Sequence, residues 1–323
     1  MTPAPLANQH IVVLLGGPSA EREVSLATGA AYAAALERLG ARVTRVDPGP
    51  SLPSDLAQTL TTLKPDLVFN GLHGRWGEDG CVQGVLETLG LAYTHSGVLA
   101  SALAMDKARS KAVLAAAGIP VPGGGLHDRH DVARDHVMQP PYVVKPNAEG
   151  SSVGVFIVRD GANAPPRELA APEWAFGDQV MVEPFVPGIE LSVAVLGRAT
   201  GPEALSVTEI RSSTGFYDYA AKYSEGGSIH VLPAPIPYAV RDKALHLAKL
   251  GHTILGCRGV TRSDFRYDDI NDLLVLLEVN TQPGMTPTSL VPEQADHTGV
   301  SFDRLVFWIV EDAYARFNAG GIA

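Results

Sequence analysis

The sequence predicts an α/β protein that begins with a doubly wound parallel sheet and continues into a part with short antiparallel strands and helices. Near the N-terminus, apolar strand-like runs alternate with helical segments, and this order favours a parallel sheet. After residue 140, short apolar runs are separated by glycine or proline turns, which is typical of antiparallel pairing. The chain of 323 residues is long enough for two or three domains with their own cores.

The N-terminal part reads as strands joined by helices. The predicted strands are IVVLLGG (11–17), ARVTRVD (41–47) and DLVFNGL (66–72). Residues 19–40 predict a helix with Ser19 as its N-cap and Gly40 beyond its end. Polar clusters follow the first and third strands, at residues 16–23 (GGPSAERE) and 73–80 (HGRWGEDG). Ligands of parallel sheets bind at the carboxyl ends of strands, so these clusters are candidates for a site.

A helix predicted over residues 100–123 is broken by Gly118 and Pro120, and we place the first domain boundary near residue 105. The next predicted strands are PYVVK, GVFIV, QVMVEPF and ELSVAVLG. The predicted domains are an N-terminal α/β domain (1–105), a central domain (106–187) and a C-terminal domain (188–323). The C-terminal domain contains a long polar excursion, residues 211–232, and such excursions are often functional lids.

Composition argues against several classes of protein. The net charge is −10 and the 25 lysines and arginines are scattered, whereas a nucleic-acid-binding protein would show a basic face. The start MTPAPLANQH does not resemble a signal peptide, and no apolar run approaches the ~18 residues that span a membrane. Cys81 and Cys257 lack the spacing of a disulfide framework or a zinc site. We therefore expect a cytoplasmic protein that binds neither nucleic acid nor membrane.

The segment KPNAEGSSVGVFIV (145–158) predicts a phosphate-binding loop. Lys145 ends an apolar strand, and the loop after it holds small and polar residues. Backbone N–H groups in such a loop can converge on phosphate oxygens, because small residues allow close approach. The spacing is neither that of a Walker A motif nor that of a dinucleotide fingerprint. A lysine at a strand end is usually a surface residue, so the loop alone leaves both interpretations open.

The segment GVTRSDFRYDDINDLLVLLEVNTQPG (259–284) predicts a β-hairpin that turns at DDIND. Alternation places apolar side chains on one face, namely Phe265, Tyr267, Leu273, Val275, Leu277 and Val279. The other face carries Arg262, Asp264, Arg266, Glu278 and Asn280, interrupted by Leu274 and Leu276. We expect Tyr267 to oppose Leu273. Arg262 then opposes Glu278, and Asp264 lies diagonally across from it.

Two carboxylates and an amide oxygen on one strand face suit Mg²⁺, which prefers oxygen ligands. A solvated strand face with an ordinary Arg–Glu pair would give the same pattern. The hinge VEPFVPGIE (182–190) is similarly open to two interpretations. Its backbone could bind the edge of an adenine, and Glu183 or Glu190 could accept hydrogen bonds from amino or ribose hydroxyl groups. Composition alone favours a plain proline-rich turn.

Seven motifs occur in one order along nearly the whole chain: GGPSAEREVSL, LHGRWGEDG, MDKARSK, KPNAEGSSVG, FYDYAAKY, TRSDFR and EVNTQPGMTPTSLVP. Together they resemble the ATP-grasp enzymes and, among these, the D-alanine–D-alanine ligase family, which makes the dipeptide terminus of bacterial peptidoglycan precursors. One such motif is weak, whereas seven in order are highly specific. The resemblance implies that the central and C-terminal domains form a two-domain ATP-grasp fold that holds ATP between them.

The resemblance also implies roles for individual residues. The implied ATP-binding residues are Lys107, Lys145, Ser152, Glu183, Val186 and Glu190. The implied ligands of Mg²⁺ or Mn²⁺, with two ions expected, are Asp264, Glu278 and Asn280. The implied catalytic residues are Glu21, Ser151, Tyr223, Arg262, Gly284 and Ser289. Further implied substrate-binding residues are His73, Lys222 and Leu290.

The implied reaction joins two D-alanine molecules. ATP phosphorylates the carboxylate of the first, the amine of the second attacks the acyl phosphate, and ADP and phosphate are released. Glu21 would hold the ammonium of the first D-alanine, and Arg262 with the backbone of Gly284 would stabilise the oxyanion. Residues 211–232 would close the site, since acyl phosphates hydrolyse in water. The resemblance further implies a homodimer.

The chain departs from the family pattern at two positions. His95 stands where glycine is expected, and Trp76 fills a position that is often smaller. His95 puts only the local loop geometry in doubt. Tyr223 implies a dipeptide product, because ligases that make D-alanyl-D-lactate commonly have phenylalanine there.

Two alternatives stay open. One is another ATP-grasp carboxylate–amine ligase with a different acceptor. The other is a non-catalytic nucleotide-binding protein, which would be expected to have lost a metal ligand or a phosphate-binding lysine. Taken alone, Glu21 could simply complement the macrodipole of the first helix.

Overall fold

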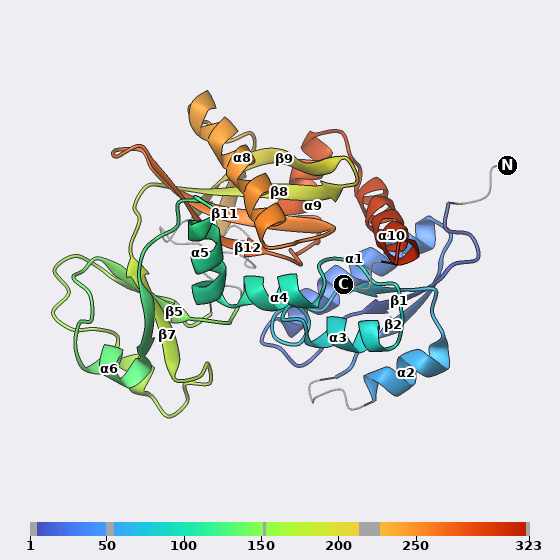
Figure 1. The fold of residues 1–323 in the computed structure, drawn as a ribbon, viewed down its shortest axis with the longest axis horizontal. Coiled ribbons are helices and arrows are strands. Elements are labelled where there is room, and N and C mark those ends of the chain that lie inside the picture. The colour runs from blue at the N-terminus through green and yellow to red at the C-terminus, as the bar shows by residue number, and fades with distance from the viewer. Residues whose placement is uncertain (1–4, 50–54, 151–152, 213–226, 321–323) are drawn as a thin grey trace.

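The computed structural model describes residues 5–49, 55–150, 153–212 and 227–320. Within these ranges the chain forms a three-stranded, a four-stranded and a five-stranded sheet, each covered by helices (Figure 1). The first sheet is parallel and the other two are antiparallel. The α/β prediction, with a parallel sheet first and antiparallel strands after it, is therefore confirmed. No helix in these ranges has the length and hydropathy needed to cross a membrane.

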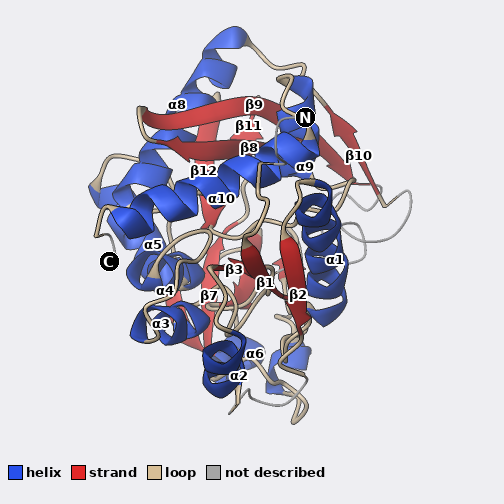
Figure 2. Cartoon of the chain, turned by 90° about the vertical axis from the view of Figure 1, so that its right-hand side faces the viewer, coloured by secondary structure: helices blue, strands red, loops and turns tan. Residues whose placement is uncertain are grey.

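The N-terminal sheet has helices on both of its faces (Figure 2). Its strand order is β2-β1-β3, with β1 (His10–Leu14), β2 (Arg42–Val46) and β3 (Leu67–Asn70). The sheet packs against α1 (Arg22–Arg38), α2 (Leu56–Leu63) and α3 (Cys81–Thr88), whereas the following helix α4 (Val98–Met105) places Ala100 and Ala104 in the core of the five-stranded sheet. Ile11 and Val13 of β1 share a core with α1. Val12 and Leu14 share another with α2 and α3, so the sheet is doubly wound.

Helix α1 begins at Arg22, three residues after the predicted N-cap. The hydroxyl of Ser19 donates to the carbonyl of His73 at 2.6 Å and accepts from the N–H of Glu21 at 3.2 Å. It is therefore used within the loop, and Glu21 occupies the N-cap position instead. The predicted N-cap at Ser19 is wrong for this reason. The predicted end is right, because Gly40, with a φ of 92°, lies just beyond the C-cap.

The four-stranded sheet has the order β4-β7-β5-β6. Its strands are β4 (Gly125–Asp128), β5 (Tyr142–Pro146), β6 (Phe156–Val158) and β7 (Gln179–Pro184). Its helices are α6 (Arg129–Arg134) and the 3-10 helix η1 (Arg167–Ala170), whereas α5 (Lys107–Ala116) packs with Leu114 in the core of the five-stranded sheet. The strands predicted in PYVVK, GVFIV and QVMVEPF all lie here, whereas ELSVAVLG belongs to the next sheet.

The five-stranded sheet has the order β10-β9-β8-β11-β12. Its strands are β8 (Ile189–Arg198), β9 (Gly201–Ser212), β10 (Ser228–Val231), β11 (Val260–Asp268) and β12 (Leu273–Asn280). Its helices are α8 (Tyr238–Ile254), α9 (Leu290–His297) and α10 (Phe302–Asn318). Helix α8 packs in one core with this sheet, while α10 lies beside α1 and shares a core with the N-terminal sheet (Figure 1).

The predicted hairpin forms, but its register differs from the prediction. Tyr267 pairs with Leu274 instead of Leu273, and Arg262 pairs with Asn280 instead of Glu278. The pairing shifts after Asp264, because one extra residue of β12 is accommodated there as a β-bulge. The bulge reverses the alternation of the preceding residues of β12.

The predicted apolar face is therefore only partly right in its second strand: Val279 joins the core as predicted, but Leu273 and Leu277 do not. Leu274 and Leu276 join the core, Leu273 is 44% exposed, and Leu277 faces a cleft. Beyond the bulge, Asp264 lies directly opposite Glu278, so the two carboxylates share a face as predicted.

The three sheets use residues 10–70, 125–184 and 189–280. The domain boundaries near residues 105 and 187 stay predictions. The ends of the excursion 211–232 are strands, since Arg211 and Ser212 complete β9 and β10 pairs with that strand. Residues 213–226, which hold most of the predicted lid, lie outside the described ranges.

Candidate active site

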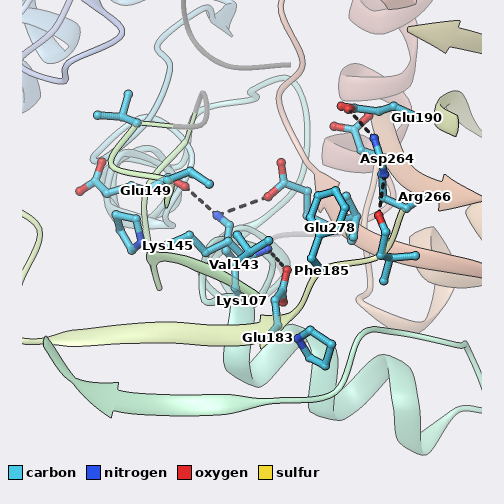
Figure 3. Close-up of a pocket in the computed structure, with 16 residues that line it drawn as sticks. Lys107, Val143, Lys145, Glu149, Glu183, Phe185, Glu190, Asp264, Arg266 and Glu278 are labelled. Carbon is cyan, nitrogen blue, oxygen red and sulfur yellow. Dashed lines mark hydrogen bonds and ion pairs between the residues drawn. The ribbon is translucent and has the colours of Figure 1, made fainter. Parts of the chain in front are cut away.

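A cleft lies between the four-stranded and the five-stranded sheets (Figure 3). The space between its walls and across its open mouth is about 890 Å³, part of which is open to solvent. One wall comes from β5, β7 and the loop after β5, and the other from β8, β11 and β12. The predicted residues that line it are Lys107, Lys145, Glu183, Val186, Glu190, Asp264 and Glu278. Motifs that are far apart in the sequence thus meet at one place.

The start of α5 is joined to the loop after β5. The N–H of Lys107 donates to the carbonyl of Asn147 at 3.0 Å, and the side-chain oxygen of Asn147 accepts from the N–H of Ala108 at 2.9 Å. The ammonium of Lys107 donates to the carbonyl of Glu149 at 2.6 Å and lies 3.3 Å from Glu278 Oε2 (Figure 3). Asn147 therefore satisfies the first two N–H groups of α5, whose N-cap is Asp106, and ties the start of the helix to the loop.

Glu183 lies in the floor of the cleft and is bound by two lysines. Lys145 Nζ is 2.5 Å from Oε1 of Glu183, and Lys111 Nζ binds Oε2. Burial alone would raise the pKa of Glu183, but the two ammonium groups hold it below its ordinary value. Burial, together with the charge of Lys145, lowers the pKa of Lys111 to about 8.

Lys111 is a further charged residue of the site for which no role was predicted from the sequence. A signal was present, because Lys111 follows Lys107 by four residues and so lies on the same face of a helix. Both lysines are buried in α5.

Asp264 and Glu278 form an acidic pair across β11 and β12. Arg262 donates to both carboxylate oxygens of Asp264, with Nε 2.9 Å from Oδ1 and Nη2 2.7 Å from Oδ2. The hydroxyl of Ser192 also donates to Oδ1, at 2.7 Å. Asn280 pairs with Arg262 across the two strands. Its side-chain oxygen accepts a hydrogen bond from the N–H of Gln282 at 2.8 Å. Two carboxylates and an amide oxygen on neighbouring strand positions are a donor set that fits Mg²⁺.

The other end of the cleft is organised by Arg266, which the sequence analysis placed on the polar face without a ligand role. Its Nε donates to the carbonyl of Val186 at 3.1 Å, and its Nη1 lies 3.4 Å from Glu190 Oε2. The guanidinium also lies 5.8 Å from the ring centre of Phe185. Arg266 therefore fixes the hinge between β7 and β8 against β11, close to Leu277.

A second group of polar residues lies at the carboxyl end of the parallel sheet. Glu21 is buried, and a Cβ atom built on Gly150 would collide with its carboxylate. Glycine at residue 150 thus lets the loop after β5 approach Glu21 closely. The predicted catalytic residues Ser151 and Tyr223, the predicted ATP-binding residue Ser152 and the predicted substrate-binding residue Lys222 lie outside the described residues.

His73 is held at both ring nitrogens. Its Nδ1 lies 2.9 Å from Glu78 Oε1, and its Nε2 lies 3.2 Å from the hydroxyl of Thr28. Burial acts to lower the pKa of His73, but Glu78 outweighs it and the pKa is raised. Burial also raises the pKa of Glu78. Glu78 and Thr28 received no role from the sequence, although Glu78 lies in the quoted motif HGRWGEDG.

The loop after β12 joins this group to the five-stranded sheet. Gln282 donates to the carbonyl of Leu72 and accepts from Asn70 at 2.9 Å. The N–H of Met285 lies 3.5 Å from the hydroxyl of Thr28, which also contacts His73. Because Gln282 and Met285 both contact the N-terminal part of the chain, the predicted residue Gly284 between them lies close to the polar group that contains His73.

Ser289 and Leu290 lie at the start of α9. The hydroxyl of Ser289 accepts from the N–H of Thr286 at 3.0 Å, and a Cβ on Gly284 would lie 3.3 Å from it. Leu290 is buried against Ile210 of β9. Ser289 thus stabilises the turn that presents Gly284.

Both departures from the family pattern lie at left-handed backbone positions. His95 has a φ of 69° and Trp76 a φ of 74°, a conformation that favours glycine. The His95 ring is buried near Tyr32 and Phe69, with ring centres 6.4 and 5.9 Å away. Burial, with the nearby charge of Arg316, lowers the pKa of His95 to about 3, so the ring is neutral. It acts as an aromatic core residue in a loop of glycine-like conformation.

Two family models match the chain: the D-ala D-ala ligase N-terminus over residues 47–96 and the D-ala D-ala ligase C-terminus over residues 115–311. Among similar proteins, the D-alanine–D-alanine ligase of Caulobacter sp. (strain K31) is 85% identical, with 100% of both chains covered. The D-alanine–D-alanine ligase of Caulobacter vibrioides is 77% identical, over 99% of this chain and 98% of that one.

Solved structures agree with these matches. The D-alanine–D-alanine ligase of Bacillus anthracis complexed with ATP aligns with a TM-score of 0.79 at 28% identity, over 97% of this chain and 100% of that chain. The enzyme of Coxiella burnetii gives a TM-score of 0.79 at 25% identity, over 98% and 96%. The ATP-grasp architecture expected from the motifs is thereby confirmed. From its family models, its relatives and its fold, this chain belongs to the D-alanine–D-alanine ligase family.

Proposed function

We propose that this protein joins two D-alanine molecules to D-alanyl-D-alanine, with ATP converted to ADP and phosphate, for the synthesis of peptidoglycan precursors. The observation that carries the proposal is the cleft between the two antiparallel sheets. It gathers Lys107 and Lys145 on one wall and the acidic pair Asp264 and Glu278 on the other. Cationic groups facing a carboxylate pair are what the transfer of a phosphoryl group requires.

Lys107 and Lys145 would bind the phosphates of ATP. Each has a partner in the described structure, Glu278 at 3.3 Å and Glu183 at 2.5 Å. A phosphate oxygen that enters the cleft can replace such a partner, because an ammonium group forms charge-assisted hydrogen bonds with phosphate oxygens as it does with carboxylate oxygens. The base would lie toward Val186, Glu190 and Leu277, at the end of the cleft that Arg266 organises.

Asp264, Glu278 and Asn280 would hold Mg²⁺ or Mn²⁺, and we expect two ions. When bound, the ions would neutralise negative charge on the transferred phosphoryl group. The cross-strand pairing of Asp264 with Glu278 and the all-oxygen donor set support this assignment. In the described structure Arg262 balances the charge of Asp264, and the hydroxyl of Ser192 donates a further hydrogen bond to it.

The remaining predicted residues would handle the two amino acids. The buried carboxylate of Glu21 would bind the ammonium of the first D-alanine, with His73 fixing the surrounding loop. Arg262 and the N–H of Gly284 would donate to the oxyanion that forms when the second amine attacks. Ser151, Tyr223, Lys222 and the lid at residues 211–232 would enclose the acyl phosphate and exclude water. We also propose that the enzyme is cytoplasmic and homodimeric.

The test is the release of ADP by the purified protein with D-alanine as the only amino acid. We expect turnover that requires Mg²⁺, together with little release when L-alanine replaces D-alanine. D-lactate and D-serine are then added in competition with D-alanine, and the products are identified by mass spectrometry. We expect D-alanyl-D-alanine to predominate.

Two results would contradict the proposal. Preferential capture of D-lactate would mean a ligase with a different acceptor. Stoichiometric binding of ATP without turnover would mean a non-catalytic nucleotide-binding protein.

A further inference from the structure

Lys111 lies beneath the cleft and does not line it. Its side chain comes from α5, one turn after Lys107, and only 4% of the residue is exposed. Its ammonium binds Oε2 of Glu183, while Lys145 binds Oε1 of the same carboxylate. The charged groups around Lys111 come from three strands: Glu183 on β7, Lys145 on β5 and, at longer range, Glu278 on β12.

The two lysines that bind Glu183 differ in what they can reach. Lys145 lines the cleft, so its ammonium can turn toward an anion there. Lys111 is enclosed, and Glu183 is its ion-pair partner among the described residues. When Lys145 turns toward a phosphate, Glu183 keeps a single cationic partner. A buried carboxylate without any partner would be strongly unfavourable, so the remaining lysine decides whether the exchange is possible.

We propose that Lys111 is a positioning residue for nucleotide binding: it keeps Glu183 charged and fixed, so that Lys145 can pass from Glu183 to a phosphate oxygen. The inference rests on the proposed function only in taking the ligand of the cleft to be a nucleotide phosphate. The proximity of Lys145 also contributes to the lowered pKa of Lys111. Movement of Lys145 toward an anion therefore removes a repulsion as well as forming a new bond.

The experiment compares four variants of the full chain: Lys111→Met, Lys111→Arg, Glu183→Gln and the double variant Lys111→Met/Glu183→Gln. Lys243→Met, which changes an exposed lysine of α8, is the matched control. The measurements are the KM for ATP, the KM for D-alanine, kcat, the Kd of ADP by calorimetry, and the Tm of each protein.

Lys111→Met should raise the KM for ATP and the Kd of ADP about tenfold or more, because Lys145 is then held by Glu183. The KM for D-alanine should change by less than about twofold, because Lys111 does not belong to the polar group around Glu21 that we propose for D-alanine binding. Lys111→Arg should recover most of the affinity. The double variant should bind ADP no more weakly than Glu183→Gln alone, since Lys111 has no carboxylate to hold there. Lys243→Met should match the wild type.

Equal increases in the KM for ATP and for D-alanine, or a lowered Tm with unchanged nucleotide affinity, would overturn the proposal and leave Lys111 a structural residue. Loss of affinity in the double variant beyond that of Glu183→Gln would overturn it as well. If Lys111→Met does not fold, Lys111→Arg and the double variant still decide the question. If the wild type binds ADP but does not turn over with D-alanine, the proposed function fails, while the calorimetry still tests Lys111.

Discussion

The cleft between the antiparallel sheets and the His73 group at the end of the parallel sheet both bury charge, but they balance it in different ways. In the cleft, Lys107 of α5 and Glu278 of β12 form an ion pair, and both line an open space. In the His73 group, the histidine, Glu78 and Thr28 satisfy one another within the N-terminal part of the chain. The charged groups of the cleft are therefore accessible to a ligand, whereas those of the His73 group are bound to one another.

This difference separates activity from stability. A ligand can replace a partner in the cleft, so loss of one cleft residue should reduce activity more than stability. Loss of one member of the His73 group leaves a buried polar atom without its partner, so stability should fall first. Variants of Glu278 in the cleft and of Glu78 in the His73 group test this separation.

The largest effect is expected for Glu278→Gln. Removal of one carboxylate from the acidic pair should lower kcat by about 10³-fold, since charge that stabilises the transferred phosphoryl group is lost. The Tm should change little, because Glu278 lies on the face of β12 that borders the cleft. Steady-state ADP release and thermal denaturation measure the two quantities. Asp269→Asn, at the exposed turn of the same hairpin, is the control, and near-normal activity of Glu278→Gln would show that the metal assignment is wrong.

A smaller effect, on stability and with a defined pH dependence, is expected for Glu78→Gln. Glu78 raises the pKa of His73 in spite of burial, so this interaction adds stability below the ordinary value of 6.5 and is lost as pH rises through the folded-state pKa. The pKa of Glu78 is also raised, by burial, and this too makes the folded state more stable at acidic than at alkaline pH. The variant should therefore be destabilised by roughly 1–3 kcal/mol near pH 5.5 and by less near pH 8.5.

Urea denaturation at the two pH values measures the difference for Glu78→Gln. The control is Glu23→Gln, which changes an exposed residue of α1. A loss of stability that grew toward alkaline pH would contradict the assigned pKa directions. A loss of activity without loss of stability would place the His73 group with the cleft.

The smallest effect is expected for Asp47→Asn, at the carboxyl end of β2. Arg22 lowers the pKa of Asp47 to about 2, with further hydrogen bonds from the N–H groups of Gly49 and Gly17. This contribution is present above the ordinary value of 3.8 and is lost as pH falls through about 2. Both side chains are about one third exposed, so the loss at neutral pH should stay below about 1 kcal/mol. Urea denaturation near pH 7 and pH 3 measures this loss of stability, with Asp242→Asn as the control.

Local patterns predicted much of the fold. The alternation of apolar runs with helical segments identified β1, β2 and β3, and short strands between glycine and proline turns identified β5, β6 and β7. The register of the β11–β12 hairpin was predicted wrongly, because alternation carries no sign of where a bulge falls. The start of α1 was also missed, since Ser19 bonds to His73, a partner 54 residues away.

The sequence by itself determined which residues we propose for the chemistry, because Lys107, Lys145, Asp264 and Glu278 stand in motifs whose order and spacing can be read along the chain. Only the tertiary structure decided how their charges are balanced. It placed Lys111 under Glu183 and set Arg266 against the hinge at Val186. It also packed the neutral ring of His95 into the core. The physical reason is that electrostatic and packing energies depend on distance in space, and partners brought together by separate sheets leave no periodic signal in the sequence.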